Sequence, residues 1–119
     1  MQENFYFTDL PIVSWNIHGI FSIHAGFRYN KLHSPHFISA VGNAKIFGLI
    51  ETHHVASEID QLQLEGFKCY NVSRKKQNQG RNSGGIAMYV HETLIKGVQK
   101  IPSSGSESIL IKLKQNFLD

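Results

Sequence analysis

Two polar residues follow apolar, strand-forming runs and carry side chains that suit a metal ion or a phosphate group. Asn16 lies in Pro11-Ile-Val-Ser-Trp-Asn-Ile-His-Gly19, and Glu51 ends the apolar part of Lys45-Ile-Phe-Gly-Leu-Ile-Glu-Thr-His53. Carboxylate oxygens are ligands that Mg²⁺ prefers, and a neutral amide can orient a phosphate or a metal-bound water. Because ligands collect beyond the carboxyl ends of strands in α/β sheets, we expect the two side chains to converge there.

Each of the two residues also has an ordinary structural role. The Glu51 carboxylate can cap the following turn at residues 52–54, and the Asn16 amide can hydrogen-bond the turn at Gly19. Neither residue is diagnostic alone. The pair, with each member ending its own strand of one sheet, is the more specific signal.

Histidine and glycine residues nearby give weaker signals. His53 and His54 are consecutive, so their side chains diverge and cannot chelate a metal as two histidines one helical turn apart would. His18 is a candidate neighbour of Asn16. Gly84-Gly85 lack the following lysine and hydroxyl residue of a P-loop, and we expect them to let the backbone enter the next strand in close packing.

A basic segment follows these motifs. Four basic residues lie within ten positions: Arg74, Lys75, Lys76 and Arg81. The whole chain has a net charge of +3, but without these four it has eight basic and nine acidic residues. The positive charge is therefore local, and such a loop binds nucleic-acid phosphates by releasing counterions. The alternative is a solvated hairpin tip.

Length and composition favour a single compact domain. The chain has 119 residues, of which 41% are hydrophobic, and its single cysteine, Cys69, excludes an intramolecular disulfide and a cysteine zinc cluster. Its N-terminus does not read as a signal peptide, and it has no apolar run near the ~20 residues that span a bilayer. We therefore expect a soluble, intracellular protein that does not enter the membrane.

Periodicity predicts the elements that must position these residues. We expect strands at 10–17, 46–50, 67–73, 85–91, 98–101 and 108–114. One helix should start at Ser34-Pro35, bury Phe37, Ile38 and Val41, and end at Gly42, and a second should be capped by Ser57 and end at Gly66. Residues 19–31 read as a loop. The strands at 10–17 and 46–50 should be parallel, and those at 67–73 and 85–91 should form an antiparallel hairpin in a mixed sheet.

The ordered motifs resemble a known family. Trp15-Asn-Ile-His-Gly19, Glu51-Thr-His53, Gly66-Phe67 and Arg81-Asn-Ser-Gly-Gly-Ile-Ala87 occur in the order found in the first half of the endonuclease/exonuclease/phosphatase superfamily. They are most similar to the endonuclease domain of non-LTR (LINE-type) retrotransposons, and the segment Ile109-Leu-Ile-Lys-Leu113 resembles the strand before that family's tyrosine motif. The similarity spans residues 10 to about 114.

This resemblance implies a partial α/β sandwich of the DNase I-like type, with a mixed sheet and helices on the outside. Glu51 would hold a catalytic Mg²⁺ or Mn²⁺, and Asn16 would help to hold the phosphate and the metal's shell. The loop containing Arg74, Lys75, Lys76 and Arg81 would lie near the DNA backbone. The family cuts phosphodiesters by metal-assisted attack of water, and its retrotransposon members nick DNA in the nucleus to prime reverse transcription.

Residues 1–119 lack the family's later Tyr, Gly-Asp-x-Asn and Ser-Asp-His motifs, so we expect a truncated domain that has little or no activity alone. Two apolar strand faces, Ile86-Met88-Val90 and Ile109-Ile111-Leu113, would lose cover and favour self-association or a partner. A non-catalytic nucleic-acid-binding or interaction module, and a phosphatase of the same superfamily, remain as alternatives.

Overall fold

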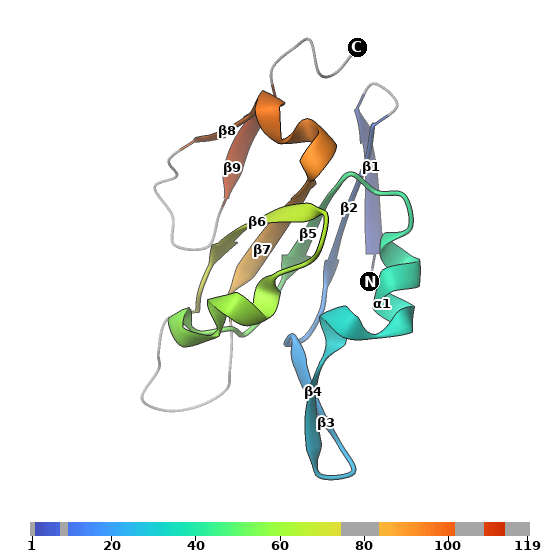
Figure 1. Ribbon diagram of the computed structural model, residues 1–119, viewed down its shortest axis with the longest axis vertical. Coiled ribbons are helices and arrows are strands. Elements are labelled where there is room, and N and C mark those ends of the chain that lie inside the picture. The colour runs from blue at the N-terminus through green and yellow to red at the C-terminus, as the bar shows by residue number, and fades with distance from the viewer. Residues whose placement is uncertain (1, 8–9, 75–83, 102–108, 114–119) are drawn as a thin grey trace.

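The computed structural model describes residues 2–7, 10–74, 84–101 and 109–113. Within this part of the chain, a five-stranded mixed sheet has the order β1-β2-β5-β7-β6, and two small sheets are formed by β3-β4 and β8-β9 (Figure 1). The strands are β1 Gln2–Phe7, β2 Leu10–Asn16, β3 Phe21–His24, β4 Phe27–Asn30, β5 Ile46–Ile50, β6 Phe67–Val72, β7 Ile86–His91, β8 Val98–Ile101 and β9 Leu110–Leu113. The helical segments are η1 Lys31–His33, α1 Pro35–Val41, η2 Ala56–Leu62 and η3 Glu92–Gly97, where η denotes a 3₁₀ helix.

Strand pairing confirms the main expectations for the sheet. β2 and β5 are adjacent and parallel, with Asn16 in register with Ile50. β6 and β7 form an antiparallel hairpin, and β7 also pairs antiparallel with β5. The protein is therefore mixed α/β, and β5 lies at the centre of its main sheet.

The hydrophobic core lies on one face of this sheet. Phe47 of β5 stacks on Tyr89 of β7 with ring centroids 4.7 Å apart, and Phe37 of α1 packs edge-on against Phe47 at 5.9 Å. The fully buried Tyr89 hydroxyl donates a hydrogen bond of 2.6 Å to the Leu62 carbonyl at the end of η2. α1 and η2 thus cover the same face.

The helix α1 begins and ends as its sequence predicts. The Ser34 side chain accepts a hydrogen bond from the Phe37 N–H, Pro35 occupies the first turn, and Gly42 ends the helix with a positive φ. Of the expected apolar stripe, Phe37 is buried and Val41 half-buried. The expectation that Ile38 is buried was wrong: it is 61% exposed, because it lines an open cavity between α1 and the segment before β6.

Two connections differ from expectation. Residues 19–31 are not a loop but contain the β3–β4 hairpin, which extends beyond the sheet (Figure 1). Its turn residues, Ala25 and Gly26, both have positive φ, as two-residue hairpin turns require, but Ala-Gly is a weak turn signal. The second helix is a 3₁₀ helix that starts at Ala56 and ends at Leu62, so neither Ser57 nor Gly66 bounds it. The Glu58 carboxylate instead accepts the Val55 N–H at its start, at 3.0 Å.

Less cover is present on the second face of the sheet. Ile50 is 50% exposed, and Ile86 and Met88 are half-buried. Val90 is fully buried, contrary to the expectation that the whole Ile86-Met88-Val90 face would lose cover. Ile109 is half-buried, and the side chains of Ile111 and Leu113 lie outside the described residues. Across the described ranges, no helix is long and apolar enough to cross a membrane.

Candidate functional site at the ends of β2 and β5

The chain segments that follow β2 and β5 remain hydrogen-bonded to each other beyond the strand ends. The Ile17 N–H donates to the Ile50 carbonyl at 3.1 Å, and the Gly19 N–H donates to the Glu51 carbonyl at 2.6 Å. A third bond, from the Ile20 N–H to the Thr52 carbonyl, measures 2.9 Å. The residues that carry the sequence motifs therefore lie in two interlocked turns at one edge of the sheet.

Asn16 stabilises the first of these turns, which spans residues 16–20. Its side-chain oxygen accepts the His18 N–H at 2.9 Å. The Lys31 ammonium adds hydrogen bonds to the carbonyls of Ile17 at 2.9 Å and of His18 at 3.1 Å. Of the two roles considered for Asn16, the turn-forming role is thus observed, and through this turn Asn16 supports the backbone that pairs with Glu51.

Glu51 lies in the second turn, which spans residues 51–54. Its Oε2 atom accepts hydrogen bonds from His53 Nε2 at 2.8 Å and from the Gly84 N–H at 3.2 Å. The side chain is 39% exposed, and within the described residues Oε1 has no hydrogen bond. The bonds from His53 and then Gly84 lower the pKa of the Glu51 carboxyl, with smaller contributions from the charges of His53 and His18, so Glu51 is held ionised.

Backbone strain is concentrated in these two turns. Among the described residues, four non-glycine residues have positive φ, and three of them are His18 at 52°, Glu51 at 57° and His53 at 59°. The left-handed conformation costs a residue with a Cβ atom roughly 1–2 kcal/mol. Such residues cluster at functional sites, where the surrounding structure holds them in place. The fourth, Ala25, belongs to the β3–β4 turn.

Gly84 and Gly85, which precede β7, also hold the Glu51 turn in place. The Gly85 carbonyl accepts the Thr52 N–H at 3.0 Å, and the Gly84 carbonyl accepts the His53 N–H at 2.9 Å. Gly85 has a φ of +85°, and a Cβ atom there would lie 2.4 Å from Thr52 Oγ1. The close packing expected at this glycine pair is confirmed for Gly85.

The two consecutive histidines point to different partners, as expected. His53 binds Glu51, whereas the fully buried His54 bridges Thr52 Oγ1 at 2.6 Å and Asn71 Oδ1 at 3.0 Å. Because the Asn71 oxygen only accepts, His54 Nε2 carries the proton and Nδ1 accepts from the Thr52 hydroxyl. Burial lowers the pKa of His54, so the imidazole stays neutral and acts as a structural link.

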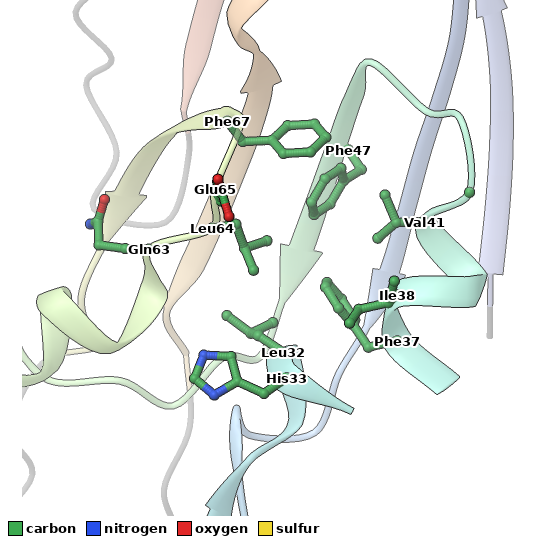
Figure 2. Close-up of a pocket in the computed structure, with 11 residues that line it drawn as sticks. Leu32, His33, Phe37, Ile38, Val41, Phe47, Gln63, Leu64, Glu65 and Phe67 are labelled. Atoms are coloured by element: carbon green, nitrogen blue, oxygen red, sulfur yellow. The ribbon is translucent and has the colours of Figure 1, made fainter. Parts of the chain in front are cut away.

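Three cavities occur in the described part of the chain, and the third, of about 550 Å³, lies between the β3–β4 hairpin and η2. The cavity in Figure 2, of about 520 Å³, lies between α1 and the segment before β6, and apolar side chains such as Phe37, Phe47 and Phe67 point into it. The second, of about 400 Å³, borders the first turn through His18 and the Glu51 turn through Thr52 and His53. Only the second combines the strained turns with basic side chains, so it belongs to the candidate site.

The structure places one residue of the predicted basic loop. Arg74 Nε donates to the His53 carbonyl at 2.9 Å, and the Arg74 N–H donates to the His54 carbonyl at 2.8 Å. Lys75, Lys76 and Arg81 lie outside the described residues. Arg74 thus connects the start of this loop directly to the Glu51 turn.

Several residues of the site were not singled out by the sequence. The sequence does not indicate His53 as a metal ligand, and in the structure His53 fixes the Glu51 carboxylate; Lys31 and Arg28 lie in a segment that was expected to be a loop. The one sequence signal for the role of His53 was its position directly after Glu51-Thr52. Contacts of Arg28 and Lys31 depend on the β3–β4 hairpin, which the sequence did not predict.

A metal at this site would find few protein ligands. The described residues contain no group of three or more His, Cys, Asp or Glu side chains able to hold a metal ion. A single ionised carboxylate suits Mg²⁺, which binds proteins through one or two carboxylates and keeps water and phosphate oxygens as its other ligands. It does not suit a structural zinc site, which needs four ligands.

Comparisons of this chain with protein-family models, with curated proteins and with solved structures found no match.

Proposed function

We propose that this chain carries the metal-binding strand ends of a Mg²⁺- or Mn²⁺-dependent phosphodiesterase that acts on DNA, a domain of the endonuclease/exonuclease/phosphatase type related to retrotransposon endonucleases. The observation that carries the proposal is the geometry of Glu51. An ionised carboxylate ends the central strand in a strained conformation, fixed through Oε2 and leaving Oε1 without a hydrogen bond in the described part of the chain.

In this proposal Glu51 is the residue that holds the metal. Bound there, the ion would act as a Lewis acid on a phosphodiester and would make an attacking water more acidic. His53 keeps the Glu51 carboxylate in one orientation by donating a 2.8 Å hydrogen bond to Oε2. Asn16 contributes by stabilising the neighbouring turn through its 2.9 Å bond from the His18 N–H.

DNA is favoured as the substrate because basic side chains surround the Glu51 turn. Arg74 binds the carbonyls of the turn, Lys31 binds the carbonyls of the adjacent turn, and Arg28 lines the same cavity as His53. Positive charge next to a metal-binding carboxylate fits a polyanionic substrate, which is attracted by counterion release irrespective of its sequence.

A non-catalytic nucleic-acid-binding module is the second candidate. It is favoured because Glu51 is the only carboxylate in the two turns, at residues 16–20 and 51–54, and because the described residues contain no three-residue metal group. One carboxylate can anchor a hard cation, but phosphodiester hydrolysis gains orders of magnitude from additional acid–base groups and charge stabilisation.

Plasmid nicking separates these two candidates. Supercoiled DNA is incubated with the protein and Mg²⁺ or Mn²⁺, and Glu51→Gln is compared with Glu65→Gln, which changes an exposed carboxylate at the rim of the other cavity. Nicking that is lost in Glu51→Gln and retained in Glu65→Gln supports the nuclease. Salt-sensitive DNA binding without nicking supports the module, and activity only on small phosphate esters would favour a phosphatase of the same superfamily. Nicking that is unaffected by Glu51→Gln contradicts the proposed role of Glu51.

A further inference from the structure

The cavity of about 400 Å³ beside the Glu51 turn is built by five separate parts of the chain, among them the turn after β2 and the helix η2. The β3–β4 hairpin contributes Phe21 and Arg28, the turn after β5 contributes His53, and Arg74 enters from the end of β6. In Figure 1 the hairpin leaves the sheet at the end where β2 and β5 stop. The volume falls within the ~300–1,000 Å³ typical of sites for small ligands.

Arg28 is held in a fixed orientation in this cavity. Its guanidinium carbon lies 3.6 Å from the centroid of the Phe21 ring, which is a cation–π contact. Its Nη2 atom also donates to Glu58 Oε2 at 2.6 Å, although the side chain is 57% exposed. A guanidinium has five N–H donors, and within the described residues Arg28 makes a hydrogen bond through Nη2 alone.

Arg74 also lines this cavity and is fixed to the turn after β5. Its Nε atom donates to the His53 carbonyl, and no hydrogen bond from its terminal nitrogens occurs within the described part of the chain. Two guanidinium groups, each anchored through one nitrogen, thus border one cavity. This arrangement suits an oxyanion, because guanidinium N–H groups pair with phosphate oxygens in a fork geometry.

The charges of the cavity sum to a positive value. Burial would raise the pKa of Glu58, but hydrogen bonds from Arg28 and from the Val55 N–H, together with the charges of Arg28 and Arg74, lower it, so Glu58 is ionised. Two arginines therefore face one carboxylate, which already accepts two hydrogen bonds. His18 and His53 add two imidazoles to the lining and no negative charge.

We infer that this cavity binds a backbone phosphate of the nucleic acid, close to the phosphodiester presented to Glu51, with Arg28 and Arg74 as its direct ligands. The inference rests on the proposed function for the identity of the ligand, and it names the substrate-positioning contacts of that site. His53 separates the two parts of the site: its ring binds Glu51 on one side, and it lines the phosphate cavity on the other.

DNA binding measured without cleavage tests this inference. A fluorescently labelled duplex is titrated with the protein at several NaCl concentrations, and Arg28→Gln and Arg74→Gln are compared with Lys96→Gln. Lys96 is an exposed lysine of η3, which follows the far end of β7, so it controls for the loss of one positive charge. Each arginine variant should flatten the slope of log affinity against log salt by about 0.9. When NaCl is raised from about 50 to about 200 mM, each arginine variant should therefore lose roughly 3- to 4-fold less DNA affinity than the wild type loses.

The variant Glu58→Gln provides a test with the opposite sign. Removing the carboxylate should increase DNA affinity. If the Arg28–Glu58 pair serves only to join the hairpin to η2, no increase is expected. The inference is overturned if Arg28→Gln and Arg74→Gln match Lys96→Gln, or if Glu58→Gln leaves DNA affinity unchanged.

Inorganic phosphate identifies the source of the ligand. Phosphate alone should shift the NMR signals of His18 and His53, and duplex DNA should displace it. A dependence of these signals on phosphate concentration that persists in the presence of saturating DNA would mean a site for free phosphate and would overturn the nucleic-acid assignment. Because this readout requires neither DNA cleavage nor a bound metal, a failure of the nuclease proposal in the nicking assay remains distinguishable from a failure of the phosphate site.

Discussion

Replacing Gly85 by alanine tests how tightly the Glu51 turn is held. A Cβ atom at this position would lie 2.4 Å from Thr52 Oγ1, 3.1 Å from the His53 nitrogen and 3.3 Å from His54 Nδ1. Thr52 and His54 are fully buried and joined by a 2.6 Å hydrogen bond, so the threonine hydroxyl cannot move aside without breaking that bond.

The expected loss of stability has two separable parts. The left-handed backbone, with φ at +85°, costs an alanine roughly 1–2 kcal/mol relative to glycine. The clash adds about 1–3 kcal/mol, which is typical of overpacking a rigid interior. Gly85→Ala should therefore lower the free energy of unfolding by about 2–5 kcal/mol.

Gly66→Ala is the matched control. Gly66 has the same φ of +85°, but a Cβ atom there would meet nothing within 4 Å. This variant should show only the backbone part, about 1–2 kcal/mol. The difference between the two variants therefore reports the contact of Gly85 with the turn.

Urea denaturation followed by circular dichroism measures both free energies of unfolding. The reasoning predicts that Gly85→Ala is at least about 1 kcal/mol less stable than Gly66→Ala. Equal losses, within about 0.5 kcal/mol, would refute it, because they would show that the turn yields to the added methyl group.

Two further predictions concern the buried polar groups. Since burial lowers the pKa of His54 below 6.5, the unfolded chain binds a proton that the folded chain does not. This contribution to stability is complete above pH 6.5 and falls as the pH decreases toward the folded pKa, by at most about 1.4 kcal/mol per pH unit. Urea midpoints between about pH 7 and about pH 5 should therefore decrease less in His54→Gln than in the wild type, and parallel curves would contradict this. Tyr89→Phe leaves the buried Leu62 carbonyl without its donor and should destabilise the protein by about 1–2 kcal/mol in the same assay, whereas Tyr70→Phe, on the less covered face, should have a smaller effect.

Much of the sheet was predictable because its residues follow simple periodic patterns. The apolar run at Ile46–Ile50 predicted a central strand, and the strand–helix–strand order placed it parallel to β2. Ser34, Pro35 and Gly42 marked the ends of α1, because capping depends on local backbone geometry.

The β3–β4 hairpin was missed because it contributes little to the core. Ile23 of β3 is 75% exposed and Phe27 of β4 is 77% exposed. The apolar residues of these strands therefore do not mark a buried face, and their sequence pattern does not indicate a strand. The 3₁₀ form of η2 was also missed, since its first turn is closed by a Glu58–Val55 contact rather than by the serine that the sequence suggested.

Sequence reasoning located the candidate site but not its connections. Asn16 and Glu51 were expected at neighbouring strand ends, and the register of Asn16 with Ile50 places them there. Long-range contacts, such as Gly84 N–H with the Glu51 carboxylate and Arg74 with the His53 carbonyl, depend on how segments far apart in the sequence meet. No local pattern records such contacts.

The central claim, that the Glu51 carboxylate binds a divalent cation, is tested most directly by a Mn²⁺ titration without DNA. Paramagnetic Mn²⁺ should broaden the backbone amide signals of His53 and Gly84, two residues that hydrogen-bond the Glu51 carboxylate, before those of η3. The broadening should persist in Glu65→Gln and disappear in Glu51→Gln. Equal broadening in Glu51→Gln, or none at these amides in the wild type, would contradict the account.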